Sequence, residues 1–268
     1  RTSPTPAARG TEMGKELDRN RSQQPLRTPS APGDGPVYRR LAAFAGVVLR
    51  ATSREVWDDA AALPATGGML LVSNHVSYAD VLAVGRYVIW SGRWPRYLGK
   101  AELWSTPVVG WFARKCGQIP VLRNTAQARD ALAPAQAALE RGECVGIYPE
   151  GGRTRDPDLW PMTARTGVAR LALSTGVPVI PTANWGTHLI MPGRRLTWPR
   201  LWPRKTIRVV MGDPVPLSDL YGRTDVEAMR IATDRIMDAV TTLLEGLRGE
   251  SRPGGVWDPR KGERVTKA

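Results

Sequence analysis

The sequence predicts an α/β protein whose mostly parallel, mixed sheet is flanked by helices. Short apolar runs alternate with longer segments of helical periodicity between residues 68 and 215, and such alternation is typical of parallel strands joined by helices. The runs at 69–72 and 144–147 are followed within two residues by Asn or Pro, which end strands. At 268 residues the chain is long enough for one sizeable core, in one or two domains.

The first element expected is an N-terminal amphipathic helix over residues 37–56. Val37, Leu41, Phe44 and Val48 recur at helical spacing, and arginines flank this stripe. Two interpretations stay open. The apolar stripe packs on the domain core, or the helix lies in a membrane interface with its basic side toward lipid headgroups.

The remaining elements follow in alternation. Strands are expected at 68–73, 96–98, 117–121, 143–148, 178–183 and 207–211. Helices are expected at 80–91, 107–115, 125–140, 163–174 and 225–247. Ligands of a largely parallel sheet bind at the carboxyl ends of its strands, so the residues that follow the apolar runs are the candidate functional residues.

Two tails are expected around a single domain over residues 37–248. Residues 1–36 are basic and rich in Pro, Ser, Thr and Gln, with almost no large apolar side chains. Such a segment cannot bury enough surface to offset the entropy of ordering, so it is predicted to be disordered. Residues 249–268 are basic and contain Gly and Pro, and they are predicted to form a tail without regular structure.

The net charge of +13 indicates an acidic partner: a nucleic acid, an anionic membrane surface or a phosphorylated substrate. Residues 185–208 interleave Trp with Arg and Lys, a mixture that favours contact with lipid headgroups. We find no recognised nucleic-acid motif and expect no nucleic-acid partner. The apolar run at 41–49 is well short of a membrane span. We therefore expect a peripheral or monotopic protein on the cytoplasmic face of the cell membrane.

The two cysteines, Cys116 and Cys144, are too few for a disulfide framework, and neither has metal-ligand spacing. No metal site is predicted, and two reduced thiols are expected.

The first candidate site follows the run at 69–72, where His75 precedes Asp80 by five residues. On one continuous helix these side chains would point about 140° apart, so they can meet only if His75 lies in a turn and Asp80 in the first turn of the next helix. Asp80 would then fix the imidazole tautomer and leave the other nitrogen as a general base. The arrangement would be a serine-hydrolase triad without its serine. The alternative is a histidine used as a turn residue.

A second stretch, residues 147–155, also follows an apolar run. Gly151 and Gly152 allow the backbone to approach a ligand closely. Arg153 and Arg155 carry guanidinium forks suited to a phosphate.

Together the two stretches resemble motifs of the glycerophospholipid acyltransferase family, whose typical bacterial members are 1-acylglycerol-3-phosphate acyltransferases. The family's first motif, Asn-His-x-Ser-x-x-Asp, is matched by Asn74, His75, Ser77 and Asp80. Its third motif, Phe-Pro-Glu-Gly-Thr-Arg-Ser, is matched at Pro149, Glu150, Gly151 and Arg153, while Tyr148, Gly152 and Thr154 replace the usual Phe, Thr and Ser.

Two further motifs of the family occur in the expected order. The stretch from Lys100-x-Glu102-Leu103 through Pro107 and Gly110 to residues 117–123 resembles the second motif, although Leu122 stands where an aspartate is often found before Arg123. Residues 177–181 read Val-Pro-Val-Ile-Pro and resemble the fourth. The four motifs span residues 68–183, under half of the chain. The fold that the resemblance implies is that of glycerol-3-phosphate acyltransferases.

The resemblance implies a role for each matched residue. His75 is expected to be the base, oriented by Asp80. Glu150, Gly151, Gly152 and Arg153 are expected to bind the acceptor, with Arg153 on its phosphate. Arg123 is expected to share that phosphate, and Lys100 to neutralise it or to assist the oxyanion. Ser77 is interpreted as a helix-start residue.

The reaction implied is transfer of a fatty acyl group from acyl-CoA or acyl carrier protein to a lysophospholipid. The acceptor favoured is 1-acylglycerol-3-phosphate, which gives phosphatidic acid, and no cofactor is needed. The alternatives are an acyltransferase acting on another lysolipid or on glycerol 3-phosphate, a thioesterase or lipase that uses Ser77, and a non-catalytic basic membrane-binding protein.

Overall fold

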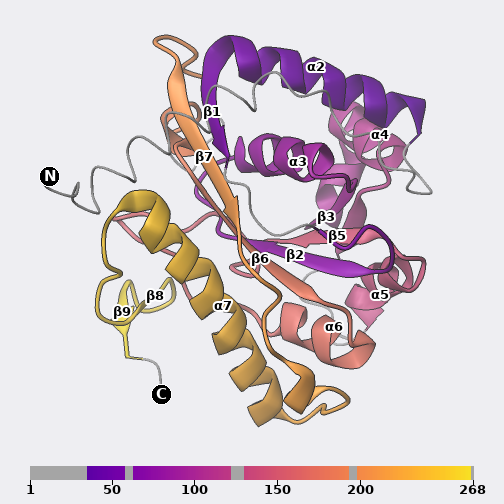
Figure 1. Cartoon of the computed structure of the whole chain (residues 1–268), viewed down its shortest axis with the longest axis vertical. Coiled ribbons are helices and arrows are strands. Elements are labelled where there is room, and N and C mark those ends of the chain that lie inside the picture. The colour runs from indigo at the N-terminus through magenta and orange to yellow at the C-terminus, as the bar shows by residue number, and fades with distance from the viewer. Residues whose placement is uncertain (1–34, 58–62, 122–129, 193–197, 267–268) are drawn as a thin grey trace, which may run out of the picture.

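The computed structural model describes residues 35–57, 63–121, 130–192 and 198–266. It contains one seven-stranded mixed sheet with helices on both faces (Figure 1), as predicted. The strand order is β1-β7-β6-β2-β5-β3-β4, and all neighbours are parallel except β6 and β7. The strands are β1 (Ser53–Trp57), β2 (Met69–Ser73), β3 (Pro95–Lys100), β4 (Ile119–Val121), β5 (Cys144–Ile147), β6 (Val179–Trp185) and β7 (Lys205–Met211).

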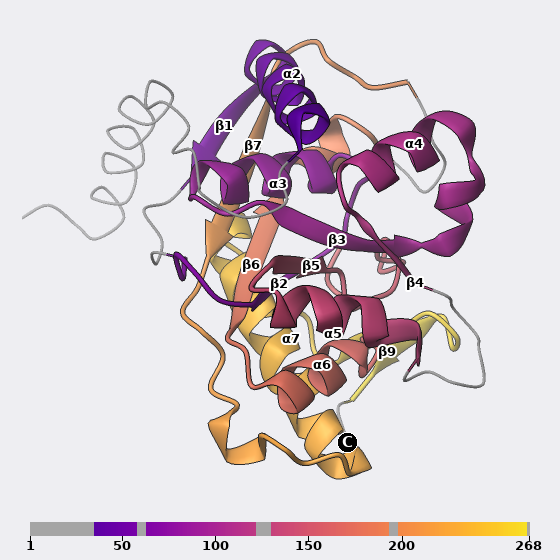
Figure 2. The same ribbon diagram turned by 90° about the vertical axis from the view of Figure 1, so that its right-hand side faces the viewer.

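Helices cover both faces of this sheet. Figure 2 shows α2 and α3 on one side and α5, α6 and α7 on the other. The α-helices are α2 (Pro36–Thr52), α3 (Asp80–Trp90), α4 (Pro107–Lys115), α5 (Ala133–Glu140), α6 (Gly167–Thr175) and α7 (Val226–Arg248). Short 3₁₀ helices are η1 (Ala101–Ser105), η2 (Asp130–Leu132), η3 (Thr187–Leu189) and η4 (Ser218–Leu220).

Central strand β2 is buried on both faces, which explains why it reads as a continuous apolar run. Successive side chains of a strand point to opposite faces. Leu70 and Val72 accordingly pack in the core under α5, α6 and α7, while Met69 and Leu71 pack in the core under α2 and α3. All four are at most 1% exposed. This double anchorage makes the end of β2 a rigid support for the residues that follow it.

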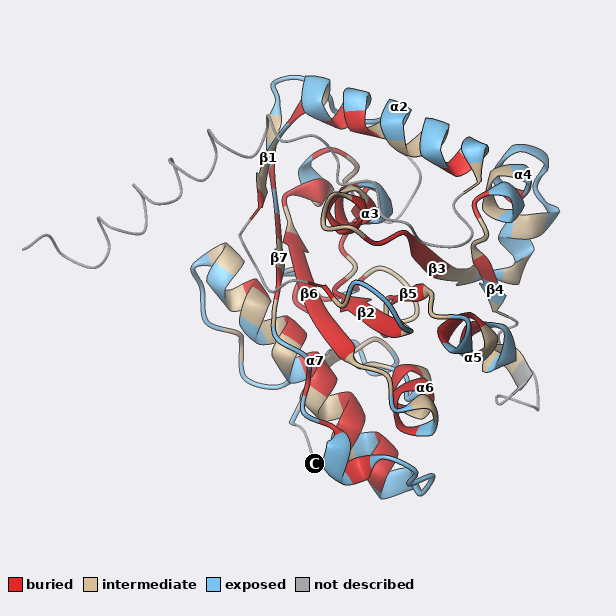
Figure 3. Cartoon of the chain, turned by 45° about the vertical axis from the view of Figure 1, so that its right-hand side comes forward, coloured by how far each residue is buried: buried red, intermediate tan, exposed pale blue. Residues whose placement is uncertain are grey.

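The N-terminal helix is amphipathic, and it is shorter than the sequence predicts. Its inner face carries the buried Tyr38, Gly46 and Leu49, while the outer face is exposed (Figure 3). The helix ends at Thr52 instead of residue 56, and the chain continues as β1, which pairs in parallel with β7. Helical periodicity over 37–49 does not reveal this change because the partner strand begins at residue 205. Among the described residues, no helix is both long and apolar enough to cross a membrane.

The C-terminal prediction is wrong in part. Instead of a tail without regular structure, β8 (Val256–Asp258) and β9 (Glu263–Val265) form an antiparallel hairpin. The guanidinium group of Arg264 binds both carboxylate oxygens of Asp156, at 2.8 and 3.0 Å, which attaches the hairpin to the domain. Arg264 is one of the basic residues in the stretch 249–268 that was predicted to be a tail, and its charge is paired with Asp156 instead. The predicted N-terminal tail lies almost entirely outside the described residues.

Candidate active site

The site begins where the chain leaves β2. The side chain of Asn74 pairs with the backbone of Asn184 at the end of the neighbouring strand, β6. Asn74 Nδ2 donates to Asn184 O at 3.0 Å, and Asn184 N donates to Asn74 Oδ1 at 2.9 Å. Both residues are at most 1% exposed. This amide pair extends the contact between the strands by one residue and fixes the point at which His75 emerges.

His75 and Asp80 meet as predicted. His75 lies in the turn and Asp80 is the first residue of α3, and 2.7 Å separates His75 Nδ1 from Asp80 Oδ2. The same oxygen accepts the backbone N–H groups of Val76 at 2.7 Å and Ser77 at 2.9 Å. These N–H groups, from the turn that precedes α3, hold the carboxylate in one position. Since Nδ1 donates to Asp80, Nε2 is the ring nitrogen available for proton transfer.

Sequence reasoning missed Thr187, which completes this arrangement. Its hydroxyl donates to Asp80 Oδ1, and it is fully buried in η3 directly after β6. Asp80 therefore accepts four hydrogen bonds, from His75, two backbone amides and Thr187. A sequence signal did exist, because Thr187 follows an expected strand. The neighbouring positions of β6 and β2, however, are known only from the sheet order.

Glu150 lies behind His75. Its Oε1 accepts the backbone N–H of His75 at 2.9 Å, and its Oε2 accepts the backbone N–H of Met162 at 3.0 Å. The side chain is 5% exposed, and burial raises the pKa of this carboxyl group to about 8. Both carboxylate oxygens are thus used within the protein, and Glu150 is not among the residues that line the adjoining cavity.

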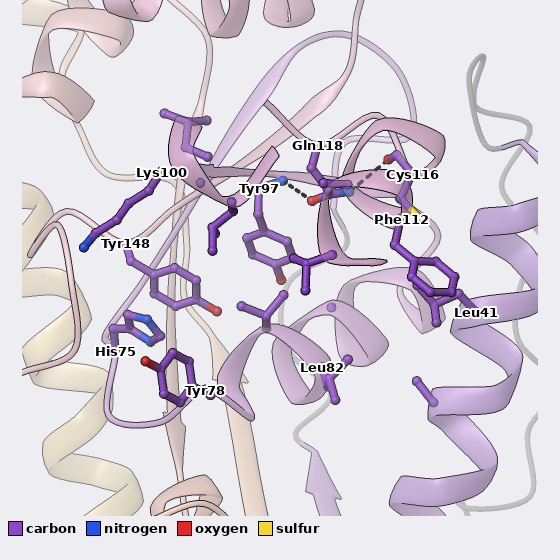
Figure 4. Close-up of a pocket in the computed structure, with 18 of the residues that line it drawn as sticks. Leu41, His75, Tyr78, Leu82, Tyr97, Lys100, Phe112, Cys116, Gln118 and Tyr148 are labelled. Carbon is purple, nitrogen blue, oxygen red and sulfur yellow. Dashed lines mark hydrogen bonds between the residues drawn. The ribbon is translucent and has the colours of Figure 1, made fainter. Parts of the chain in front are cut away.

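A mostly apolar cavity of about 560 Å³ opens beside His75. Figure 4 shows His75, Tyr148 and Lys100 at one end, called here the His75 end, and Leu41 and Phe112 toward the other. The walls come from α2, α3, α4 and the end of β3. The imidazole ring of His75 stacks on Tyr148 with 4.2 Å between ring centroids. Such a cavity next to a histidine can hold an apolar chain whose reactive end reaches the imidazole.

The predicted substrate-binding residues divide into three groups. Lys100, Gly151, Gly152 and Arg153 line the cavity together with His75. The guanidinium carbon of Arg153 lies 3.5 Å from the ring centroid of Tyr78, and Figure 4 shows Tyr78 beside His75. Glu150 is withdrawn behind the cavity wall, and Arg123 lies outside the described residues.

The backbone at Gly151 needs a glycine. Its φ of 71° is in the left-handed region, and a Cβ there would lie 2.9 Å from Arg165 Nε. At Gly152 a Cβ would meet nothing within 4 Å. The position where the family usually has Thr is therefore open space in this chain.

Ser77 lies in the turn before α3, whose N-cap is Ala79, so it is not the helix-start residue that the sequence suggests. It is fully buried, its Oγ donates to Met191 O at 3.1 Å, and the same Oγ accepts the N–H of Ala79 at 3.1 Å. A nucleophilic serine would be hydrogen-bonded to the base instead. Within the part of the chain that the structure describes, the site offers a base with no serine hydrogen-bonded to its free nitrogen, beside an apolar cavity with cationic side chains.

Parts of this chain are similar to known acyltransferases. The model of the Acyltransferase family matches residues 57–185. A chloroplastic 1-acyl-sn-glycerol-3-phosphate acyltransferase of Brassica napus is 33% identical over 123 residues, which are 45% of this chain and 34% of that protein. A lyso-ornithine lipid O-acyltransferase of Pseudomonas aeruginosa is 35% identical over 118 residues, 43% of this chain and 42% of that protein.

The fold is shared with a solved structure. The crystal structure of a 1-acyl-sn-glycerophosphate acyltransferase from Thermotoga maritima matches with a TM-score of 0.61 and 23% identity, over 80% of this chain and 81% of that one. The chain spans about a third of the length of its Brassica relative and about two-fifths of its Pseudomonas relative. The matched segment contains the four motifs, including His75 and Arg153. Residues 57–185, just under half of this chain, are therefore similar to the acyltransferase family that includes the 1-acyl-sn-glycerol-3-phosphate acyltransferases.

Proposed function

We propose that the protein transfers a fatty acyl group from acyl-CoA or acyl carrier protein to the free hydroxyl of a lysophospholipid. The acceptor favoured is 1-acylglycerol-3-phosphate, and the product is then phosphatidic acid. The observation that carries the proposal is the His75–Asp80 pair, with 2.7 Å between Nδ1 and Oδ2, at one end of an apolar cavity.

In the proposed reaction His75 acts as a general base. Its Nε2 takes the proton of the acceptor hydroxyl while that oxygen attacks the carbonyl carbon of the thioester. The new C–O bond forms, the C–S bond breaks, and the departing thiolate receives the proton back from His75. Asp80 holds the tautomer and stabilises the imidazolium that exists between these steps. No acyl-enzyme is needed, because the acceptor supplies the nucleophile.

The two substrates are assigned by chemistry. The apolar cavity suits the acyl chain, since each buried methylene contributes about 0.8 kcal/mol. Lys100 and Arg153 at the His75 end suit an anionic headgroup. The guanidinium group of Arg153 can donate two parallel hydrogen bonds to one phosphate. A lyso-ornithine acceptor, the substrate class named for the Pseudomonas relative, is the second candidate.

The test is a purified-protein assay with labelled hexadecanoyl-CoA or hexadecanoyl-acyl carrier protein and a panel of acceptors, read by mass spectrometry. Acylation of 1-acylglycerol-3-phosphate above the other lysolipids is expected. Acylation of glycerol 3-phosphate or lyso-ornithine lipid in its place would overturn the acceptor assignment. Turnover that disappears in His75→Ala would eliminate the alternative of a non-catalytic membrane-binding protein.

We also propose that the protein docks on an anionic membrane surface, on its cytoplasmic face. Phe44 and Val47 on α2 are 67% and 57% exposed, and Trp198 and Trp202 are 93% and 85% exposed. Arg204, which follows those tryptophans, donates to Arg50 O and Ser53 O, both at 2.6 Å. This contact brings the two segments predicted to meet lipid to the same end of α2, where both can reach one surface.

A further inference from the structure

The hairpin β8–β9 is joined to residues 149–163, called here the Glu150 loop. Met162 of this loop forms a parallel bridge with Trp257 of β8, and Thr163 N donates to Trp257 O at 2.9 Å. The backbone N–H of Met162 donates to Glu150 Oε2, and Glu150 Oε1 accepts the backbone N–H of His75. A continuous series of contacts therefore runs from the hairpin to the backbone of the proposed base.

A charged side chain holds the hairpin on this loop. The guanidinium group of Arg264, on β9, donates to both carboxylate oxygens of Asp156 at 2.8 and 3.0 Å and to Asp158 Oδ2 at 2.8 Å. Asp156 is 3% exposed, so removal of Arg264 would leave a buried carboxylate without its cation. Arg264 thus joins β9 to the Glu150 loop by a buried ion pair.

Apolar packing does not fix the hairpin, because the space beneath it is hollow. The hairpin lies beside α7 (Figure 1), and a cavity of about 520 Å³ between the two is lined by Met162, Val256 and Val265, among others. Within the described residues, no side chain of β8 or β9 belongs to a buried apolar cluster of the core. An isolated two-stranded hairpin is marginally stable in water, so the contacts of Arg264 and Trp257 determine its position.

The Glu150 loop needs external support because its own conformation is irregular. No helix or strand occurs from residue 148 to residue 166, all of which are described. Leu159 has a φ of 62°, in the left-handed region that residues with a Cβ disfavour. Such a conformation persists only where the surroundings impose it. The end of α7 also contributes, since Arg248 donates to Asp158 O at 2.7 Å and lies 4.1 Å from the ring centroid of Trp160.

The hairpin has no direct contact with the proposed substrate cavity. No residue of β8 or β9 lines the cavity beside His75, and Glu150 is also absent from its wall. A displacement of the hairpin would therefore reach the reaction as a displacement of the His75 backbone. Because the rate depends steeply on the placement of reacting groups, a shift of about 1 Å can cost roughly a hundredfold in rate.

We propose that the hairpin β8–β9 positions the catalytic base, with Arg264 as its positioning residue. The ion pair of Arg264 holds β8 against Met162. Met162 then supports Glu150, which sets the position of His75. This inference rests on the proposed function. It assigns a role in the reaction to a part of the chain that lies beyond residue 185, where the match to the Acyltransferase family model ends.

The first experiment measures kcat and KM with hexadecanoyl-CoA and 1-acylglycerol-3-phosphate varied separately. Arg264→Ala is expected to lower kcat about tenfold and to leave the donor KM unchanged. Arg264→Lys should lose less, because an ammonium group keeps the charge opposite Asp156 without the two parallel hydrogen bonds. Arg235→Ala is the matched control, since Arg235 also binds both oxygens of a carboxylate, that of Asp219 in η4, at 2.6 and 2.9 Å. Its kcat should equal that of the wild type.

A double-mutant cycle tests whether Arg264 acts through Glu150. Both carboxylate oxygens of Glu150 accept N–H groups, and the NH₂ group of an amide cannot accept one. Glu150→Gln therefore interrupts the connection between Met162 and His75. In this background Arg264→Ala should lower kcat by no more than about twofold, because the two changes break the same connection. Equal fold losses in the two backgrounds would show independent effects and would overturn the proposal.

Hydrogen exchange gives a measurement that does not depend on turnover. The N–H groups of His75 and Met162 are both bound to Glu150, so both should exchange faster in Arg264→Ala. The N–H of Val72 in β2 is the reference for global unfolding, and its exchange rate should stay that of the wild type. This comparison separates a local loss of support from a general loss of stability.

The outcomes distinguish the positioning role from the reaction. Unchanged exchange at His75 in Arg264→Ala, or exchange that rises equally at His75 and Val72, would overturn the positioning role. Faster exchange at His75 alone, in a protein that acylates no acceptor, would retain that role and reject the proposed function. A lower melting temperature with the kcat of the wild type would also overturn the proposal. If Arg264→Ala does not fold, Arg264→Lys takes its place in each comparison, and exchange and kcat equal to those of the wild type would overturn the positioning role.

Discussion

Glu150 holds the backbone of His75 from behind, with 2.9 Å between Glu150 Oε1 and His75 N. The carbonyl oxygen of His75 in turn accepts the N–H of Thr154 at 2.7 Å. Both backbone polar groups of His75 are therefore bound by the loop that carries Arg153. The base and the cation that we assign to the acceptor phosphate sit on one hydrogen-bonded unit, so a change in Glu150 should act through the position of His75.

Glu150 should make stability depend on pH. Burial raises its pKa to about 8 in the fold, whereas the unfolded chain has an ordinary value of about 4.3. Between these values the folded protein binds the extra proton, so the contribution of Glu150 to the free energy of unfolding is full below the unfolded pKa and is lost as pH rises through about 8. The melting temperature of the wild type relative to Glu150→Gln should fall between about pH 5 and about pH 9. Parallel curves for the two proteins would contradict this.

Removal of the base should affect chemistry more than binding. His75→Ala is expected to lower kcat by roughly 10²–10⁴-fold, with little change in the apparent affinity for either substrate. Asp80→Asn should lower kcat by a smaller factor than His75→Ala. Its amide oxygen can occupy the position of Oδ2, which faces three donors, while its NH₂ group faces the hydroxyl of Thr187.

Thr187→Val serves as the graded control for this series. It removes one of the four donors to Asp80 and leaves the other three. We expect a loss in kcat smaller than that of Asp80→Asn, no more than about tenfold. Steady-state kinetics with each substrate varied separately give these values. A kcat of His75→Ala close to that of the wild type would exclude His75 as the base.

Arg153 should govern affinity for the acceptor. Arg153→Ala is expected to raise the acceptor KM, measured with lysophosphatidic acid, and to leave the acyl-donor KM unchanged. Some loss of kcat is also expected, because a misplaced hydroxyl reacts more slowly. Arg153→Lys should recover only part of the lost affinity for the acceptor. A lysine ammonium group replaces neither the two hydrogen bonds of a guanidinium group nor its stacking on Tyr78. An effect on the donor alone would assign this arginine to the phosphates of coenzyme A.

Membrane docking should depend on salt and on the exposed aromatic side chains. Each Lys or Arg near an anionic surface contributes on the order of 1 kcal/mol, so binding to anionic liposomes should exceed binding to neutral ones and should weaken in salt. Phe44→Ser and Trp202→Ser should reduce co-sedimentation.

Val226→Ser is the matched control for these two variants. Val226 is 81% exposed at the start of α7, which covers the opposite face of the sheet from α2. This change should leave co-sedimentation unchanged. Equal binding to anionic and neutral liposomes at all salt concentrations would show that charge plays no part.

The sequence alone was sufficient for the class of fold and for the meeting of His75 with Asp80. Both depend on local patterns. An apolar run such as 69–72 predicts a buried strand, and helical spacing from Val81 onward predicts where the next helix begins. A five-residue separation across that boundary then allows one geometry in which the side chains touch, which the structure has.

Only the tertiary structure decided which distant residues complete the site. Strand β6 lies beside β2, which brings Asn184 to Asn74 and Thr187 to Asp80. The family's third motif led us to assign Glu150 to substrate binding. In the structure, the carboxylate of Glu150 accepts hydrogen bonds from the backbone N–H groups of His75 and Met162 instead.

The strand β1 and the hairpin β8–β9 were missed for a related reason. Strand β1 gains its partner from residues 205–209, and the hairpin is held to the domain through Asp156. Local sequence encodes the spacing of apolar side chains along one element, because that spacing follows from the geometry of a helix or strand. Which elements become neighbours depends on how buried surfaces and hydrogen-bonding groups of the whole chain are satisfied together, and no single segment contains that information.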